Sequence, residues 1–390
     1  MEEARGSPDF ASFWMGGFES STHINKYGKR LDLLAVTQHD RWAAQDYGLM
    51  KAAGLSVVRD AARWHLIEQQ RSVYDFSSFV PLLDAAKLHD MQVIWDICHY
   101  GFPDDVDLLS PDFVGRFTDY AVAFATFIKN HSDDVPFYCP FNEISFFSWA
   151  AGEAGWIHPF LRGRGGEVKR QLVRACIHAT AAIWKIDSRA RFVYVDPIIH
   201  VHPPRAHPDL AEAARLHTES QYEALDMFMG RTAPELGGHP RYLDIIGVNF
   251  YHSNQWEYGG ERLRWEDNPR DTRWIPLHQM LEEMHKRYGR PLFIAETSHV
   301  GVGRGEWITE IADEVCVALK KGVPILGVCL YPIIDRPDWE DETHWHNSGL
   351  WDFKRQGDTF VRVINDDYAQ AFRAAQWKVQ QCLIESRRTL

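Results

Sequence analysis

The stretch PFYCPFNEISFFSWAAG, residues 136–152, begins as an apolar run and then places Asn142 and Glu143 inside an aromatic segment. Aromatic and β-branched residues favour extended structure, so 136–142 is predicted to be a strand that ends at an acid. A second stretch, PLFIAETSHVG at residues 291–301, reaches Glu296 in the same way. A charge beside a buried strand is costly unless it is paired, so both acids are candidates for a functional site.

Short apolar runs of this kind recur along the whole chain, and most are followed by a polar loop and a segment with helical spacing of apolar residues. This alternation predicts repeated βα units. The predicted strands are eight in number and span residues 13–19, 56–60, 92–98, 136–142, 191–196, 244–251, 292–296 and 325–331.

Helices are predicted between these strands from apolar periodicity and terminal signals. They span residues 40–54, 76–90, 113–131, 168–186, 277–289, 307–322 and 366–384. Eight βα units favour a (β/α)8 TIM barrel in one domain, residues 1–390, over a doubly wound sheet, because no GxGxxG turn follows the first strand. The segment 196–221 is expected to be an elaborated loop at the catalytic face.

The composition is that of a globular protein, with 45% hydrophobic and 25% charged residues. A formal net charge of −12 repels phosphates and anionic lipid, so neither a nucleic acid nor a membrane is an expected partner. The first residues, MEEARGSPDF, lack the apolar core of a secretory signal, and no apolar run approaches membrane-spanning length. A cytoplasmic location is therefore expected.

The six cysteines are scattered and have no CxxC spacing. They are expected to be small core residues with free thiols. They stand at positions Cys98, Cys139, Cys176, Cys316, Cys329 and Cys382.

In a (β/α)8 barrel the active site lies at the carboxyl ends of the strands. Glu143 and Glu296 end the predicted fourth and seventh strands, and we expect them to face each other across the barrel mouth. Glycoside hydrolysis needs such a pair, and carboxyls about 5–5.5 Å apart give retention through a covalent glycosyl-enzyme. The sequence therefore predicts a glycosidase.

Four motifs in order along the chain, SVVRDAARW, PFNE, DIIGVNFY and IAETS, resemble those of glycoside hydrolase family 1, the β-glucosidase and β-galactosidase group of clan A. The resemblance implies that Glu143 is the acid/base and Glu296 the nucleophile, and that Asn142 binds the sugar 2-hydroxyl. It further implies that Arg59 and Tyr251 contact Glu296. A cation and a phenol donor there would stabilise the ionised nucleophile.

The same resemblance implies a sugar pocket. The pair His99 and Tyr100 in WDICHYGFP is similar to the family's His-Trp pair, and Asp338 with Trp339 is similar to its Glu-Trp pair. Three positions of this pocket differ from the family pattern. Tyr331 stands where the family has Trp, and Asp338 stands where it has Glu. Glu19 stands where it has a Gln that binds two hydroxyls.

Three of these residues have a structural alternative. Glu19 either accepts sugar hydroxyls and repels a phosphorylated or uronate sugar, or pairs with a nearby Arg or Lys. Arg59 either supports the nucleophile or is only a buried ion-pair partner. Tyr251 either donates to the nucleophile or only packs.

No cofactor or metal is expected. His200, His202, His207, His344 and His346 stand in two short histidine-rich segments, but neither has the helical HExxH arrangement. The sequence thus predicts an exo-acting, retaining β-glycosidase that acts on a small carbohydrate or glycoside. A transglycosidase with the same covalent intermediate and a catalytically silent sugar-binding barrel stay as alternatives, and homo-oligomerisation stays open.

Overall fold

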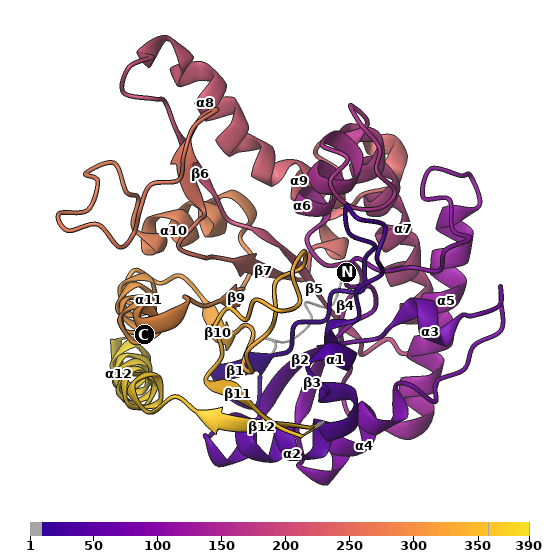
Figure 1. The fold of residues 1–390 in the computed structure, drawn as a ribbon. Helices are drawn as coiled ribbons and strands as arrows, with labels where there is room; N and C mark the ends of the chain where they lie inside the picture. Colours follow the sequence, from indigo (N-terminus) through magenta and orange to yellow (C-terminus); the bar gives the residue numbers. More distant parts are fainter. Residues whose placement is uncertain (1–9, 358, 390) are drawn as a thin grey trace.

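The computed structural model describes residues 10–357 and 359–389, in which eight parallel strands close into a barrel (Figure 1). Around the barrel the order is β1, β10, β9, β7, β5, β4, β3, β2, and β2 pairs back to β1. Each strand overlaps a predicted one, so the prediction of a (β/α)8 barrel is confirmed. The strands are β1 Trp14–Gly17, β2 Val57–Ala61, β3 Gln92–Asp96, β4 Phe137–Cys139, β5 Arg191–Pro197, β7 Ile245–Asn249, β9 Leu292–Thr297 and β10 Ile325–Leu330.

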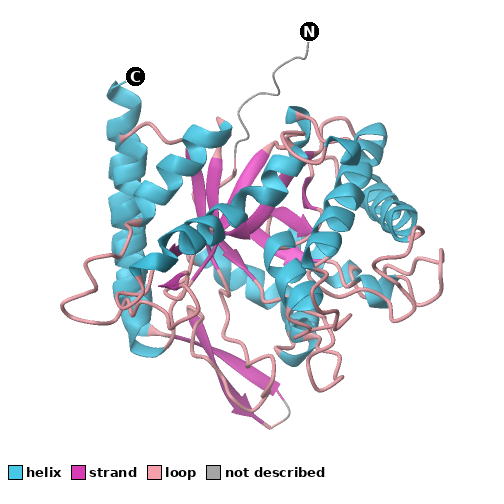
Figure 2. Cartoon of the chain, turned by 90° about the horizontal axis from the view of Figure 1, so that it is seen from above, coloured by secondary structure: helices cyan, strands magenta, loops and turns pink. Residues whose placement is uncertain are grey.

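Helices surround the strands, as the view from above shows most clearly (Figure 2). The long ones are α2 His39–Ala52, α5 Phe113–His131, α7 Gly165–Ile186, α10 Leu277–Tyr288, α11 Arg304–Lys320 and α12 Asp366–Thr389. Shorter α-helices are α1 Leu33–Val36, α3 Trp64–Ile67, α4 Val80–Leu88, α6 Ile144–Phe147, α8 Ala211–Glu219 and α9 Glu223–Phe228, with a π-helical turn at Ser148–Glu153. Within the described ranges, none of these helices has the length and apolarity needed to cross a membrane.

Two parts of the chain differ from the sequence prediction. The segment 196–221, expected as a loop, contains β6 His200–His202 and α8, and Figure 1 shows α8 projecting from the barrel. β6 pairs in parallel with β8 Gln255–Glu257. A hairpin of β11 Trp351–Gln356 and β12 Thr359–Ile364 was not predicted; it pairs as a separate two-stranded sheet outside the barrel.

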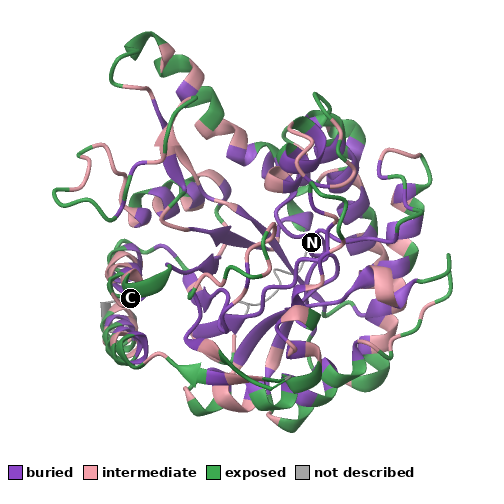
Figure 3. Cartoon of the chain, viewed as in Figure 1, coloured by how far each residue is buried: buried purple, intermediate pink, exposed green. Residues whose placement is uncertain are grey.

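Two apolar layers hold the barrel together. Side chains from alternate strand positions fill its interior, among them Met15, Val57, Phe137 and Phe293, while a larger cluster joins the strands to the helices (Figure 3). Gly247 belongs to the interior layer. A Cβ at Gly247 would lie 2.8 Å from the Val195 side chain, so only glycine leaves room for its neighbours.

The expectation that all cysteines are free is wrong for one pair. Cys316 of α11 and Cys382 of α12 form a disulfide with Cα atoms 5.7 Å apart. Their separation of 66 residues gives no spacing signal that could have revealed the pair. The other four cysteines are free and buried, as expected. Because disulfides are more frequent in oxidising compartments, the pair counts against the expected cytoplasmic location.

A buried charge network ties the hairpin to the first strands. His39 Nδ1 lies 2.7 Å from Asp46 and Nε2 lies 2.9 Å from Asp60. Arg362 of β12 donates two hydrogen bonds to Asp46, at 2.7 and 2.9 Å. The ring of Phe18 stacks on His39 at 3.5 Å, so the network also supports the end of β1. Burial acts to lower the pKa of His39, but the two carboxylates outweigh it and raise that pKa to about 9.

We predict that this network makes folding stability pH-dependent. Because the folded pKa of His39 is raised above its unfolded value of about 6.5, its contribution is complete below pH ~6.5 and is lost as the pH rises through about 9. Urea unfolding from pH 6 to pH 10 should therefore show that His39→Gln lowers the free energy of unfolding most at pH 6. The exposed His207→Gln variant is the control. An equal loss for His39→Gln at every pH would contradict the charged state of His39.

Candidate active site

Glu296 lies at the carboxyl end of β9 between two donors. Arg59 of β2 donates from Nη1 to Glu296 Oε1 at 2.6 Å, and the Tyr251 hydroxyl donates to Oε2 at 2.8 Å. Glu296 is 5% exposed. Each carboxylate oxygen thus has a hydrogen-bond donor that fixes its direction. A buried carboxylate that is oriented in this way is suited to nucleophilic attack.

Arg59 connects the ends of four strands. Beyond Glu296, its Nε and Nη2 donate to both oxygens of Asp96, at 3.0 and 2.7 Å, and Nη2 also donates to Asn142 Oδ1 at 2.6 Å. Asp96 in turn lies 2.8 Å from His99 Nδ1. The sequence analysis missed Asp96 because it placed this residue inside a predicted strand of residues 92–98, whereas β3 ends at Asp96.

Glu143 follows β4 with a left-handed φ of 46° and is nearly buried. Asn249 Nδ2 donates to its Oε1 at 2.7 Å, and the Tyr100 hydroxyl donates to Oε2. Asn249 was also missed, although it stands two residues before Tyr251 in the motif DIIGVNFY.

Burial, followed by the nearby charge of Glu296, raises the pKa of Glu143 to about 8. Glu143 is therefore mainly protonated at neutral pH. Burial raises the pKa values of Tyr100 and Tyr251, and the charges of Glu143 and Glu296 raise them further. Both acids are therefore close to both tyrosines. In the barrel, β5 and β7 stand between the strands that carry the two acids. The barrel thus gathers at one end a carboxyl group whose pKa is raised, that of Glu143, and one that is ion-paired with Arg59, that of Glu296.

The residues of the expected sugar pocket contact one another. His99 Nε2 lies 3.1 Å from Asn142 Nδ2 and 3.4 Å from the Tyr331 hydroxyl, and the His99 and Tyr331 rings are parallel. The guanidinium of Arg59 lies over the Tyr331 ring, 5.4 Å from its centroid. Tyr331 thus contacts both the expected sugar pocket and Arg59, the cationic partner of Glu296.

Glu19 pairs with a cation, as expected if its role is structural rather than sugar binding. Arg336 Nε lies 3.2 Å from Glu19 Oε2, and Ser21 donates to Oε1 from its backbone and its hydroxyl, at 3.1 and 2.5 Å. Although burial alone acts to raise the pKa of Glu19, Arg336, His99 and Ser21 lower it overall. The positive charge of Arg336 offsets the negative charge of Glu19. The expected repulsion of phosphorylated or uronate sugars depends on that negative charge and is therefore weakened.

Asp338 and Trp339 are placed differently from each other. Asp338 Oδ1 accepts hydrogen bonds from the backbone of Glu340 and Asp341 at 2.7 and 3.2 Å, and Oδ2 lies 3.3 Å from His346, so its carboxylate is used within its own loop. The Trp339 ring lies 5.8 Å from that of Tyr100. The structure therefore brings Trp339 to the cluster and leaves Asp338 at its edge.

A cavity of about 690 Å³ adjoins the cluster and is lined by Glu143 and Tyr251. Its other walls include the aromatic side chains Phe146, Trp149 and Trp256. A larger hollow of about 890 Å³ lies at the opposite, amino-terminal ends of the strands, where barrel enzymes do not carry their chemistry. The smaller cavity has the size and the polar-aromatic lining of a site for a small organic molecule.

No family model matches the chain, and no curated protein does. Solved structures do match. A β-glucosidase from Thermotoga maritima in complex with deoxynojirimycin has a TM-score of 0.74 at 13% identity, over 93% of this chain and 97% of its own. The complex with castanospermine has a TM-score of 0.73 at 12% identity, over 94% and 97%. A structure described as a family 1 β-glucosidase from the same organism has a TM-score of 0.72 at 13% identity, over 94% and 98%.

The barrel is similar to that of family 1 β-glucosidases. At such low identity the likeness shows the fold, while the chemistry must be argued from the side chains.

We predict that Arg59→Met is strongly destabilising. The substitution leaves Asp96 and Glu296 buried without their shared cation, which costs about 3–5 kcal/mol. Urea unfolding at pH 7 measures the loss. Arg71→Met is the matched control, because Arg71 is 59% exposed and its partner Asp112 is 72% exposed. That change should stay within about 0.5 kcal/mol. Equal stability of the two variants would contradict the role of Arg59.

Proposed function

We propose that this protein is a retaining β-glycosidase that hydrolyses O-glycosyl bonds, with Glu296 as nucleophile and Glu143 as acid/base. The observation that carries the proposal is the contrast between the two acids. Glu296 is ion-paired with Arg59 and accepts a hydrogen bond from Tyr251, while burial and the nearby Glu296 raise the pKa of Glu143 to about 8. A carboxylate held by a cation and a second carboxyl that keeps its proton are what double displacement needs.

In the first step Glu296 attacks the anomeric carbon while Glu143 donates its proton to the leaving oxygen. The new ester bond removes the negative charge of Glu296, and with it one cause of the raised pKa of Glu143. Glu143 can then stay ionised and accept a proton from water as that water attacks the anomeric carbon. The ester breaks, Glu296 regains its charge, and Glu143 is protonated again.

We propose a neutral hexose or a related monosaccharide at the nonreducing end as the group transferred. Asn142, His99 and Tyr331 offer hydrogen-bonding groups beside Glu296. The leaving group would occupy the cavity of about 690 Å³, because Glu143 lines it. The similar barrels bound to deoxynojirimycin and castanospermine are consistent with a carbohydrate ligand. We propose that the whole chain forms one catalytic domain around this site.

A catalytically silent sugar-binding barrel is the second candidate, and one observation favours it. The Tyr100 hydroxyl is hydrogen-bonded to Glu143, and His99 is hydrogen-bonded to Asn142 and Tyr331, so a substrate must displace existing contacts. A transglycosidase would use the same two acids and differ only in the acceptor.

Hydrolysis of a panel of aryl β-glycosides tests the proposal. We expect Glu296→Ala to abolish turnover and Glu143→Gln to lower it by about 10²–10⁴-fold when the leaving group needs a proton. The exposed Glu167→Gln variant is the control. A 2-deoxy-2-fluoro glycoside should add one glycosyl mass to the parent, on the peptide that contains Glu296.

Sugar binding without turnover by the parent would identify a silent barrel. Turnover that persists in both variants would reject the site assignment. Product analysis with competing alcohols separates a transglycosidase from a hydrolase.

The pH dependence of hydrolysis is the next prediction. Because Glu143 acts in its protonated form and its pKa is raised to about 8, kcat/KM should fall as the pH rises above about 8. A substrate with a dinitrophenyl leaving group needs no proton, so its alkaline limb should disappear. Steady-state rates from pH 5 to pH 10 provide the measurement. The same alkaline limb for both leaving groups would contradict the role of Glu143 as the acid.

A further inference from the structure

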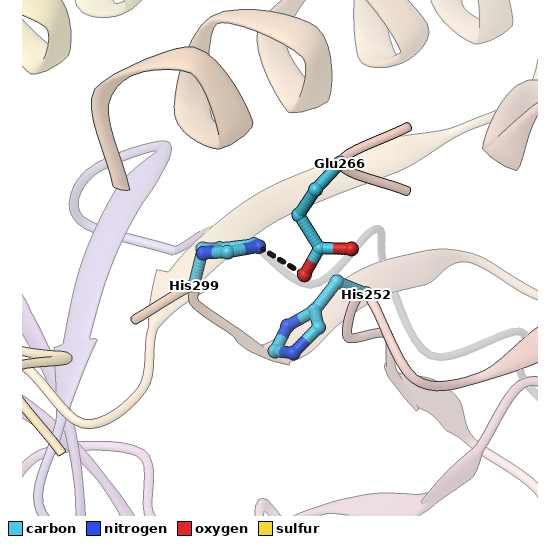
Figure 4. Close-up of side chains that lie close together, drawn as sticks. All are labelled: His252, Glu266 and His299. Atoms are coloured by element: carbon cyan, nitrogen blue, oxygen red, sulfur yellow. Dashed lines mark hydrogen bonds and ion pairs between the residues drawn. The ribbon is translucent and has the colours of Figure 1, made fainter. Parts of the chain in front are cut away.

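Three side chains of metal-ligating type lie together beside the barrel mouth (Figure 4). They are His252, Glu266 and His299, and their ligand atoms all lie within 4.8 Å of one another. His299 Nε2 is 3.2 Å from Glu266 Oε1, and the two imidazole rings are 4.2 Å apart. The histidines considered in the sequence analysis, such as His200 and His344, belong to no such group within the described residues.

The three residues come from different segments near the nucleophile. His252 follows Tyr251, which donates to Glu296, and His299 stands three residues after Glu296. Glu266 lies in the segment between β8 and α10. A ligand held by all three would therefore connect three loops around the proposed active site.

The ring nitrogens have room for a ligand. His252 Nδ1 is buried and has no hydrogen-bond partner among the described residues, which is rare for a buried polar atom. The Val300 backbone N–H donates to His299 Nδ1 at 2.8 Å, so the ring proton lies on Nε2, which is 3.2 Å from Glu266 Oε1. Metal binding through Nε2 requires this proton to move to Nδ1, where the Val300 carbonyl, 2.9 Å away, is the acceptor.

The donor set selects the kind of metal. Two imidazole nitrogens and one carboxylate suit Zn²⁺ and related transition-metal ions, whereas Mg²⁺ and Ca²⁺ prefer oxygen. Zinc bonds of about 2.0–2.1 Å require the ligand atoms to move closer together. The half-buried His252 and the exposed Glu266 have the freedom to do so.

Arg262 is the cation that now holds Glu266. It donates to both carboxylate oxygens, at 3.1 and 3.0 Å. Its side chain is 36% exposed, so it can turn into solvent when a metal ion binds. A metal ion and Arg262 therefore compete for one carboxylate.

We propose that His252, Glu266 and His299 bind one divalent transition-metal ion, for which Zn²⁺ fits the donor set. The ion stabilises the loops after β7, β8 and β9 and takes no part in the reaction. This inference stands on its own contacts and does not depend on glycosidase activity.

The test uses the purified full chain, freed of metal with a chelator and titrated with ZnCl₂ by calorimetry. We expect one equivalent of Zn²⁺ to bind and to raise the Tm, whereas MgCl₂ does neither. His252→Ala, His299→Ala and Glu266→Gln should each weaken binding at least tenfold. The exposed His207→Ala variant is the matched control. Circular dichroism without metal checks that each variant is folded.

Arg262→Gln gives a second, opposite readout. This substitution removes the cation that competes for Glu266 and leaves all three ligand residues unchanged. It should therefore tighten Zn²⁺ binding several-fold. No binding by the parent, or affinity unchanged in all three ligand variants, would overturn the proposal. Unchanged affinity in Arg262→Gln would exclude Glu266 as a ligand and overturn the three-residue site.

Discussion

The candidate site depends on one buried guanidinium. Arg59 is 1% exposed and meets two carboxylates, Asp96 and Glu296, from two other strands, together with the amide of Asn142. A planar guanidinium offers donors in a fixed fork, so it sets the directions of its partners as well as their charge. The positions of the nucleophile candidate and of the residue preceding Glu143 are therefore linked through a single side chain.

The alternation of a strand separates two charge systems with different tasks. Arg59 and Asp60 are neighbours on β2, and successive side chains of a strand point to opposite faces. Arg59 faces the barrel mouth, while Asp60 joins His39 on the side of the helices. Arg59, which contacts Glu296, and Asp60, which belongs to the network that holds the β11–β12 hairpin, thus project from opposite faces of β2.

Backbone strain accompanies the acid. Glu143 and Tyr100 both adopt positive φ, at 46° and 69°, and their side chains are hydrogen-bonded to each other. Non-glycine residues in this region are held there by their surroundings, often at functional sites. The Tyr100 hydroxyl thus occupies one hydrogen-bonding position on Glu143.

The sequence was sufficient for the barrel because each strand is a short apolar run with clear ends. It pointed to Glu143 and Glu296 as candidates because both stand at the ends of predicted strands. Asp96 and Asn249 lie inside the predicted strands 92–98 and 244–251, and only the structure shows that β3 and β7 end at them. The group of His252, Glu266 and His299 is dispersed over three loops, so only folding brings it together.

Sequence spacing likewise gave no sign of the Cys316–Cys382 bridge. That bridge changes how the fold can come apart. A last helix ordinarily frays or detaches before the rest of a domain, since it has neighbours on one side of the chain only. Here α12 is fastened covalently to α11, the helix that follows the strand of Glu296. α12 cannot leave the barrel wall alone, so local opening there must also involve α11.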